Sequence, residues 1–167
     1  RAREALTVGG YPAGRLIDVE AVRYLEGPAK ADKAHSAAGV LLVLGEYHWD
    51  TTERIIDVVA EAIVMSGFQG DIVFRSHPAI ARQWNHPPKG FRMDSHPTSH
   101  AALRSASIVV CGAQSSVAIE ALRMAKPTYL VADGRTFASS PAEEFSPSWV
   151  FGSENLATRL REWPNTE

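Results

Sequence analysis

Short runs of apolar residues alternate with segments of helical periodicity over most of the chain. The run at 40–44 contains only apolar residues, which is typical of a strand buried on both faces. Similar runs predict three further strands and weaker patterns predict two more, at 72–75, 108–111, 128–131, 90–93 and 149–151. Strands that alternate with helices in this rhythm predict an α/β fold with a doubly wound, mostly parallel sheet.

The longest helical pattern follows the first of these strands. One side of it is apolar and the other polar, the apolar side consisting of Ile55, Ile56, Val59 and Ile63. Asp50 and Glu53 have the spacing of a capping box, which predicts that the helix begins at Asp50, and Gly67 predicts its end. Weaker patterns predict helices at 96–106, 117–124 and 154–163.

Composition narrows the class of protein. A net charge of −2 with no dense basic run argues against a nucleic-acid-binding surface. A single cysteine excludes a disulfide framework and fits a reducing compartment. No apolar run approaches the roughly 18 residues of a membrane span, and no signal peptide is visible. The chain opens on Arg-Ala-Arg without methionine, so we expect a piece of a longer protein.

The predicted strands place three loops along one edge of the sheet. These loops, at 45–49, 76–79 and 112–116, follow the carboxyl ends of their strands, where ligands of such sheets bind. In the last loop Ser115 and Ser116 precede a helix, and helix N-terminal N–H groups with nearby hydroxyls favour an anion such as phosphate. The alternative is that these serines only cap the helix, as serine commonly does.

Histidine adds a second part to this candidate site. A His-Pro pair occurs at His77, His86 and His96, and only His77 directly follows a well-patterned strand. An imidazole at that position can approach the anion site from the neighbouring loop. His96 and His100 are four residues apart and could present two metal ligands on a helix, but no carboxylate accompanies them at motif spacing. A solvated helix face is the favoured interpretation, and no metal site is predicted.

Two segments carry a family resemblance. Residues 75–79 (RSHPA) and 115–121 (SSVAIEA) resemble the HP and SS motifs of GT-B fold glycosyltransferases. The enzymes that use CMP-activated sugars, including bacterial sialyl-, polysialyl- and Kdo-transferases, are the most similar, and wall-polymer glycerophosphotransferases share the pattern. The Ala-Lys-Pro sequence at 125–127 is similar to a common Gly-Lys-Pro turn, and the segments at 10–12 and 19–25 look like the interdomain part of surface carbohydrate biosynthesis proteins.

The resemblance implies roles for particular residues. The HP histidine and the SS hydroxyls would hold the donor's phosphate, and His77 would stabilise charge on the leaving phosphate as the glycosidic bond breaks. Glu120 matches an acidic position that often reaches donor hydroxyls. Together with the strand-end loops, this gives eight donor-binding candidates: Gly45, Glu46, His77, Pro78, Gly112, Ser115, Ser116 and Glu120. The implied donor is a CMP-linked sugar, which is a substrate, and no cofactor is implied.

The resemblance also implies what the chain lacks. A GT-B enzyme needs two Rossmann-like domains, and we expect one here, at 38–167, after an interdomain or linker segment at 1–37. The partners would be a nucleotide-sugar, a missing N-terminal domain and a glycan or lipid-linked acceptor, in a cytoplasmic enzyme of surface polysaccharide biosynthesis that can lie at the inner face of the membrane. Two alternatives remain open: a sugar-nucleotide epimerase domain, which predicts UDP preference and paired carboxylates, and a non-catalytic nucleotide-binding module. The isolated domain is expected to be inactive.

Overall fold

A six-stranded sheet forms the centre of the computed structural model, which describes residues 2–16, 39–80, 87–132, 142 and 148–163. Its strands are β1 (Val40–Leu44), β2 (Asp71–Arg75), β3 (Arg92–Met93), β4 (Ile108–Gly112), β5 (Thr128–Val131) and β6 (Ser148–Val150). All neighbouring strands are parallel, in the order β3-β2-β1-β4-β5-β6. The predicted parallel sheet is confirmed. Its order reverses between β1 and β4, and such a switch point is where ligands of open α/β sheets bind.

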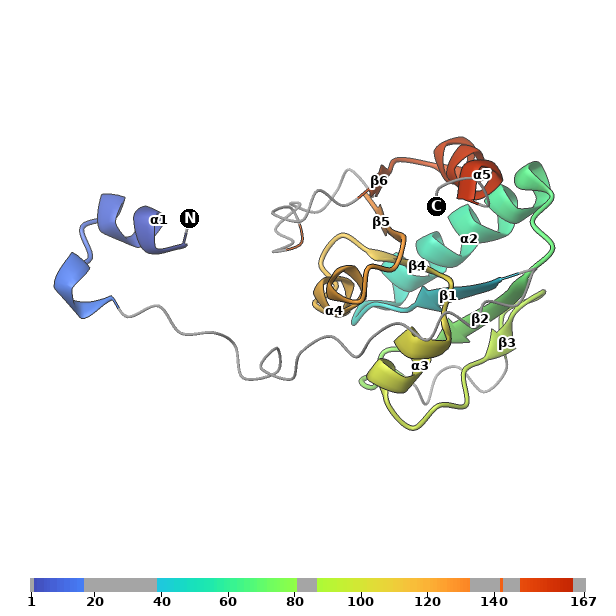
Figure 1. The fold of residues 1–167 in the computed structure, drawn as a ribbon, viewed down its shortest axis with the longest axis horizontal. Helices are drawn as coiled ribbons and strands as arrows, with labels where there is room; N and C mark the ends of the chain where they lie inside the picture. The colour runs from blue at the N-terminus through green and yellow to red at the C-terminus, as the bar shows by residue number, and fades with distance from the viewer. Residues whose placement is uncertain (1, 17–38, 81–86, 133–141, 143–147, 164–167) are drawn as a thin grey trace.

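Helices cover both faces of the sheet (Figure 1). α2 (Trp49–Ser66) and α5 (Ser153–Glu162) lie on one face, and α3 (Ser99–Ser105) and α4 (Val117–Arg123) lie on the other. Successive residues of β1 point to opposite faces, so that Leu41 and Val43 pack towards α2 while Leu42 and Leu44 pack towards α3 and α4. This two-sided burial explains why the strand has no polar residue.

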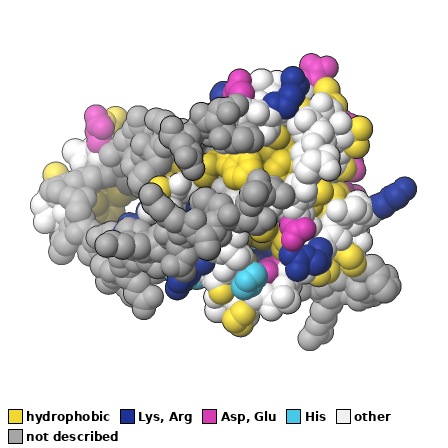
Figure 2. Space-filling model, turned by 45° about the vertical axis from the view of Figure 1, so that its right-hand side comes forward, with side chains coloured by type: hydrophobic (Ala, Val, Ile, Leu, Met, Phe, Trp, Pro, Cys, Tyr) yellow, Lys and Arg dark blue, Asp and Glu magenta, His cyan; other side chains and the backbone are white. Residues whose placement is uncertain are grey.

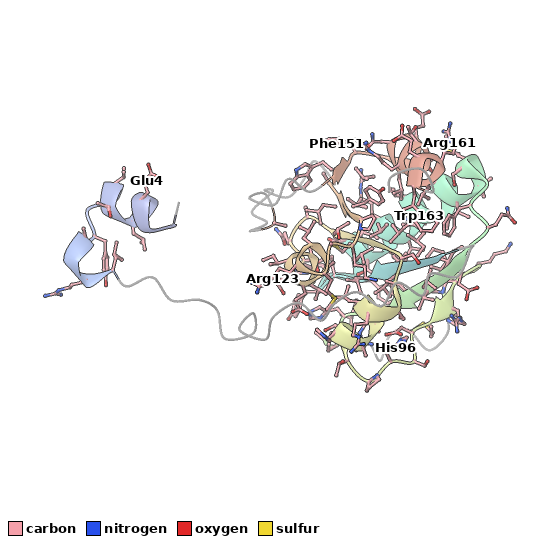
Figure 3. All side chains as sticks on the ribbon, in the orientation of Figure 1. Glu4, His96, Arg123, Phe151, Arg161 and Trp163 are labelled. Atoms are coloured by element: carbon pink, nitrogen blue, oxygen red, sulfur yellow. The ribbon has the colours of Figure 1, made fainter. Side chains whose placement is uncertain are left out.

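The contact between α2 and α5 is closed by aromatic rings. Trp163 follows α5 and lies on the side of that helix that faces α2 (Figure 3), where its ring meets Phe68 edge-on at 6.3 Å between centroids. Gly67, directly before Phe68, ends α2 in the left-handed conformation with φ of 70°. The sequence predicted this helix end, because glycine adopts that conformation without strain. Both rings pack against the apolar cluster that α2 and α5 form with the sheet.

Two short helical segments, α1 (Ala2–Val8) and η1 (Ala13–Arg15), precede the sheet domain. The predicted domain boundary between residues 37 and 38 and the 19–25 segment lie outside the described residues. His86 of the second His-Pro pair also lies outside them. These interpretations stay predictions.

The start of α2 differs from the predicted capping box. The N-cap residue is His48, and Asp50 lies within the first turn. The Thr52 side chain, fully buried, donates from Oγ1 to the carbonyl oxygens of Glu46 and His48 at 3.1 and 3.0 Å and accepts the Glu46 N–H at 2.9 Å. Because this threonine already ties the chain before the helix to its first turn, the helix begins earlier than the capping-box spacing indicated.

The helix predicted at 96–106 is shorter than the pattern indicated. It begins at Ser99, because the Oγ1 of Thr98 accepts the N–H of Ala101 at 3.1 Å and caps the helix there. His96 therefore precedes the helix. The last strand also ends one residue early, at Val150, and Phe151 beyond it is 74% exposed.

The turn between α4 and β5 has an unusual backbone. Ala125 has φ of 54°, in the left-handed region that favours glycine, which is the residue found there in the similar turn. The next residue, Lys126, is 5% exposed, and its Nζ donates to the carbonyl oxygen of Ala106 at 2.6 Å. The lysine therefore satisfies a buried carbonyl directly after α3 and fixes the turn against it.

Charged side chains of both signs lie on the face of the molecule that Figure 2 shows. Figure 2 shows lysine, arginine, aspartate and glutamate side chains interspersed on one face, without gathering by sign. Within the described ranges, no helix combines the length and apolar character that a membrane span requires.

Candidate functional site

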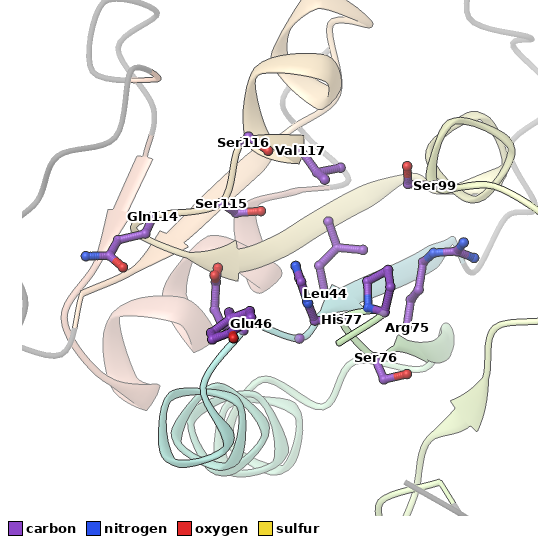
Figure 4. A pocket seen from close by; sticks show the side chains of 13 residues that line it. Leu44, Glu46, Arg75, Ser76, His77, Ser99, Gln114, Ser115, Ser116 and Val117 are labelled. Atoms are coloured by element: carbon purple, nitrogen blue, oxygen red, sulfur yellow. The ribbon is translucent and has the colours of Figure 1, made fainter. Parts of the chain in front are cut away.

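A cavity of about 410 Å³ opens at the carboxyl edge of the sheet, where β1, β2 and β4 end (Figure 4). We call it the main cavity. It is lined by Leu44, Gly45, Glu46, Tyr47, Arg75, Ser76, His77, Pro78, Ser99, Gln114, Ser115, Ser116 and Val117. The structure therefore brings the three strand-end loops together at the topological switch point.

Six of the eight candidate residues line the main cavity. Gly112 and Glu120 do not. Gly112 is the last residue of β4, outside the cavity lining, and it contacts Glu46. Glu120 lies in the first turn of α4 and is half-buried. The donor-binding role of all eight residues stays a prediction.

The His77 ring is held in one orientation. The backbone N–H of Ala79 donates to Nδ1 of His77 at 3.2 Å. A neutral imidazole whose Nδ1 accepts a hydrogen bond carries its proton on Nε2, so His77 presents an N–H donor from its other nitrogen. The Tyr47 ring meets His77 edge-on at 5.6 Å between centroids, and Tyr47 is 61% exposed at the mouth of the main cavity.

The loop between β4 and α4 supplies hydroxyl and backbone groups. The N–H of Ser115 donates to the carbonyl oxygen of Gly112 at 3.2 Å, which folds the loop into a tight turn. Ser116 is the N-cap residue of α4, but its side chain makes no capping hydrogen bond. The alternative that the serine pair serves only to cap the helix therefore has no support from Ser116.

Glu46 places a carboxyl group against this loop. It lines the main cavity and also a smaller cavity of about 100 Å³ beside it, which includes His48 and Gln114. Its Oε1 atom is buried and has no hydrogen-bond partner among the described residues. Burial raises the pKa of Glu46, although the Gly112 N–H and the nearby His48 act in the opposite direction. The buried thiol of Cys111 below the loop also has a raised pKa, because of burial and the charge of Glu46.

A charged cluster supports the other end of the main cavity. Arg75 Nη1 donates to Oδ2 of Asp94 and, at 2.9 Å, to the carbonyl oxygen of His96. The ring of His96 also pairs with Asp94, whose side chain is 1% exposed. Burial acts to raise the pKa of Asp94, but the hydrogen bonds from His96 and Arg75 outweigh it and lower that pKa. The cluster ties β2 to the segment after β3 and fixes the Arg75 guanidinium at the cavity wall.

The cluster also changes the interpretation of His96. Its partner is Asp94, and its ring does not lie on a helix face with His100, as the four-residue spacing had suggested. Over the described part of the chain, no group of three or more histidine, cysteine, aspartate or glutamate side chains is placed to hold a metal ion.

Several residues of the site carried no sequence signal of their own. Thr52 acts through hydrogen bonds to the loop just before its own helix, and Asp94 acts through a hydrogen bond to Arg75, 19 residues earlier. Arg75 was noted only as part of the RSHPA motif. Tyr47 and Gln114 lay within the candidate loops, but no pattern singled them out. Ser99 reaches the main cavity because α3 packs beside the switch point, which requires the sheet order to be known.

The solved structures that the chain is similar to include several glycosyltransferases. The spinosyn forosaminyltransferase SpnP matches 90% of this chain with a TM-score of 0.55 and 14% identity. The spinosyn rhamnosyltransferase SpnG matches 80% with a TM-score of 0.54 and 15% identity. The glycosyltransferase VinC, in complex with dTDP, matches 78% with a TM-score of 0.50 and 19% identity. No protein-family model matches the chain, and no curated protein sequence matches it.

These matches define the class of the fold. The sheet domain has the Rossmann-like fold of the C-terminal domain of GT-B glycosyltransferases. The chain spans only part of those enzymes, namely 39% of the length of SpnP, 38% of SpnG and 34% of VinC. At these identities the similarity is one of fold.

Proposed function

We propose that this chain is the donor-binding half of a glycosyltransferase and that the main cavity binds the phosphate of a nucleotide-linked sugar. The observation that carries the proposal is the meeting of an Nε2–H donor from His77 with the Ser115 and Ser116 hydroxyls at one switch point. Hydroxyls and the Nε2–H of a neutral imidazole are donors to a phosphate oxygen, and the charge of the phosphate strengthens these hydrogen bonds. The dTDP bound by VinC supports a nucleotide ligand for this fold.

The nucleotide that we propose is CMP. The charged groups on the wall of the main cavity are Glu46 and Arg75, as far as the structure describes the chain. Asp94 already balances the guanidinium of Arg75, so little net positive charge is left for a ligand. A CMP-linked sugar carries one phosphate charge and a diphosphate-linked sugar carries two, so the low positive charge favours the former. The HP and SS motifs point to the same class of donor.

His77 has a second proposed role at the moment of reaction. As the bond between the sugar and the phosphate breaks, negative charge grows on the phosphate, and a donor already oriented towards it stabilises that charge. The Ala79 N–H and the edge of Tyr47 keep the imidazole in place for this role. We assign no catalytic base to the described residues. In this proposal the base and the acceptor site belong to an N-terminal domain that completes the cleft.

The setting that we propose is surface polysaccharide biosynthesis in the cytoplasm, at the inner face of a membrane. The motif resemblance supports it, and the acceptor would be a glycan or a lipid-linked glycan. The epimerase alternative requires paired carboxylates near the sugar. Of the described residues that line the main cavity, only Glu46 carries a carboxyl group, which favours the glycosyltransferase.

Replacing His77 by alanine tests the proposal. Wild-type chain is expected to bind CMP weakly, with a Kd near 1 mM or about 4 kcal/mol, because half of the cleft is open to water. The His77→Ala variant should bind about ten times more weakly, since a charge-assisted hydrogen bond contributes about 1.5 kcal/mol or more. NMR titration measures both constants.

His100→Ala is the matched control, because His100 is exposed on α3 and does not line the main cavity. It should bind CMP like the wild type. Equal affinities of the His77→Ala and His100→Ala variants would remove His77 from the site. Absence of any CMP, UDP or dTDP binding to the wild-type chain would contradict the proposed function as a whole.

A further inference from the structure

Glu46 is an acidic side chain in a cavity that we propose binds an anion. Its carboxyl lines the main cavity together with His77, Ser115 and Ser116, the groups proposed to hold a phosphate. Two negative charges in a partly buried site repel each other more strongly than in water, and a shared site of this kind disfavours ionisation of one of them. A carboxylate at this position would therefore oppose the binding that its neighbours favour.

The carboxyl of Glu46 lies against the loop that follows β4. Figure 4 shows its side chain rising from the end of β1 towards the loop at Gln114 and Ser115. A Cβ atom at Gly112 would lie 2.5 Å from Oε1, so the carboxyl group occupies the space that a side chain at Gly112 would need. Oε1 is buried there without a hydrogen-bond partner among the described residues. An unpartnered buried oxygen is costly when it carries charge, and this cost falls when the carboxyl is neutral.

We propose that Glu46 takes up a proton from solvent when a ligand phosphate enters the main cavity, so that the site holds its nucleotide with this carboxyl neutral. The neutral carboxyl has an O–H that donates a hydrogen bond, whereas the carboxylate can only accept one. The inference rests on the proposed nucleotide site but not on the identity of the base. Burial has already raised the pKa of Glu46, so only part of the shift remains for the ligand to supply.

Other titratable groups surround the carboxyl. His48 faces it from the start of α2 and Cys111 from β4, and His77 and Arg75 share the cavity from the end of β2. Histidine side chains gain a proton in the same range of pH and also favour anion binding at low pH. The pH dependence of the wild-type chain alone therefore does not isolate Glu46. A comparison with a variant at each pH does.

The experiment compares wild-type chain with Glu46→Gln at about pH 5 and about pH 8, the range in which raised carboxyls and histidines titrate. The probe is the methyl ester of CMP, whose single phosphate charge stays constant over that range. At the higher pH the variant should bind about ten times more tightly, which corresponds to a shift of about one unit in the pKa of Glu46 on binding. At the lower pH the difference between the two affinities should narrow, because a larger fraction of Glu46 is then protonated in the wild type.

Glu53→Gln is the matched control, because Glu53 is exposed on α2 and does not line the main cavity. Its affinity should equal that of the wild type at both pH values. If Glu46→Gln does not fold, Glu46→Ala carries the same expectation. A variant-to-wild-type ratio that does not change with pH, or weaker binding by the variant at both values, overturns the role of Glu46. If neither the wild type nor any variant binds the probe, the proposed function itself is overturned, and with it the role of Glu46.

Discussion

Replacing Phe74 by alanine is expected to lower the free energy of unfolding by about 3–5 kcal/mol, the usual cost of removing a fully buried aromatic side chain. Phe74 has no exposed surface and packs in the core between the sheet and the α2 and α5 layer. Its ring also lies under the first loop of the site, since a Cβ atom at Gly45 would be 3.3 Å from it. Urea unfolding followed by circular dichroism measures the change.

Val64→Ala is the control for this substitution. Val64 is 83% exposed near the end of α2, so the change should alter the free energy of unfolding by no more than about 0.5 kcal/mol. A loss below about 1.5 kcal/mol for Phe74→Ala would mean that this part of the core collapses around the cavity or is packed differently.

The second large effect is expected at Gly112. Its substitution by alanine places a Cβ atom 2.5–2.8 Å from the Glu46 side chain, closer than real Cβ contacts. Either Glu46 moves into the main cavity or the 112–116 loop moves outwards. Overpacking of this kind costs about 1–3 kcal/mol of unfolding free energy, and the displaced loop should weaken CMP binding about tenfold. Thermal unfolding and NMR titration measure the two effects.

A double variant separates the clash from other causes. Combining Gly112→Ala with Glu46→Ala removes the carboxyl that the new methyl group meets, so stability and CMP affinity should recover most of the loss. This non-additivity is the expected signature of two residues in contact. Equal losses in the single and double variants would show that Gly112 is needed for its backbone and not for the space beside Glu46.

The periodicity of the sequence was sufficient to predict the sheet. In β1 the absence of any polar residue predicted burial on both faces, and in α2 the spacing of Ile55, Ile56 and Val59 predicted the buried side. These signals are local, because a strand or helix repeats its buried positions every few residues. Strand-end positions then predicted the meeting of the His77 and Ser115 loops, since parallel strands end at one edge.

The contacts that hold the site together could not be predicted in the same way. Arg75 and Asp94 are adjacent because Phe74 pairs with Met93, and that register depends on β3 lying beside β2. The helices α2 and α3 begin at other residues than the sequence predicted, because hydrogen bonds of the Thr52 and Thr98 side chains determine where they start. Such bonds compete with the local signals of a helix terminus. Burial of the Glu46 carboxyl could not be predicted either, because it depends on Gly112 of β4 lying beside the loop that contains Glu46.

Binding of a nucleotide phosphate between His77 and the 112–116 loop is the central claim, and an NMR titration of the full chain with CMP tests it most directly. We predict that the backbone amide resonances of 112–117 and of Ser76, His77 and Ala79 shift first and saturate with one common Kd. Shifts confined to the loop from His86 to Lys89, around the second His-Pro pair, would contradict the claim and place the phosphate elsewhere.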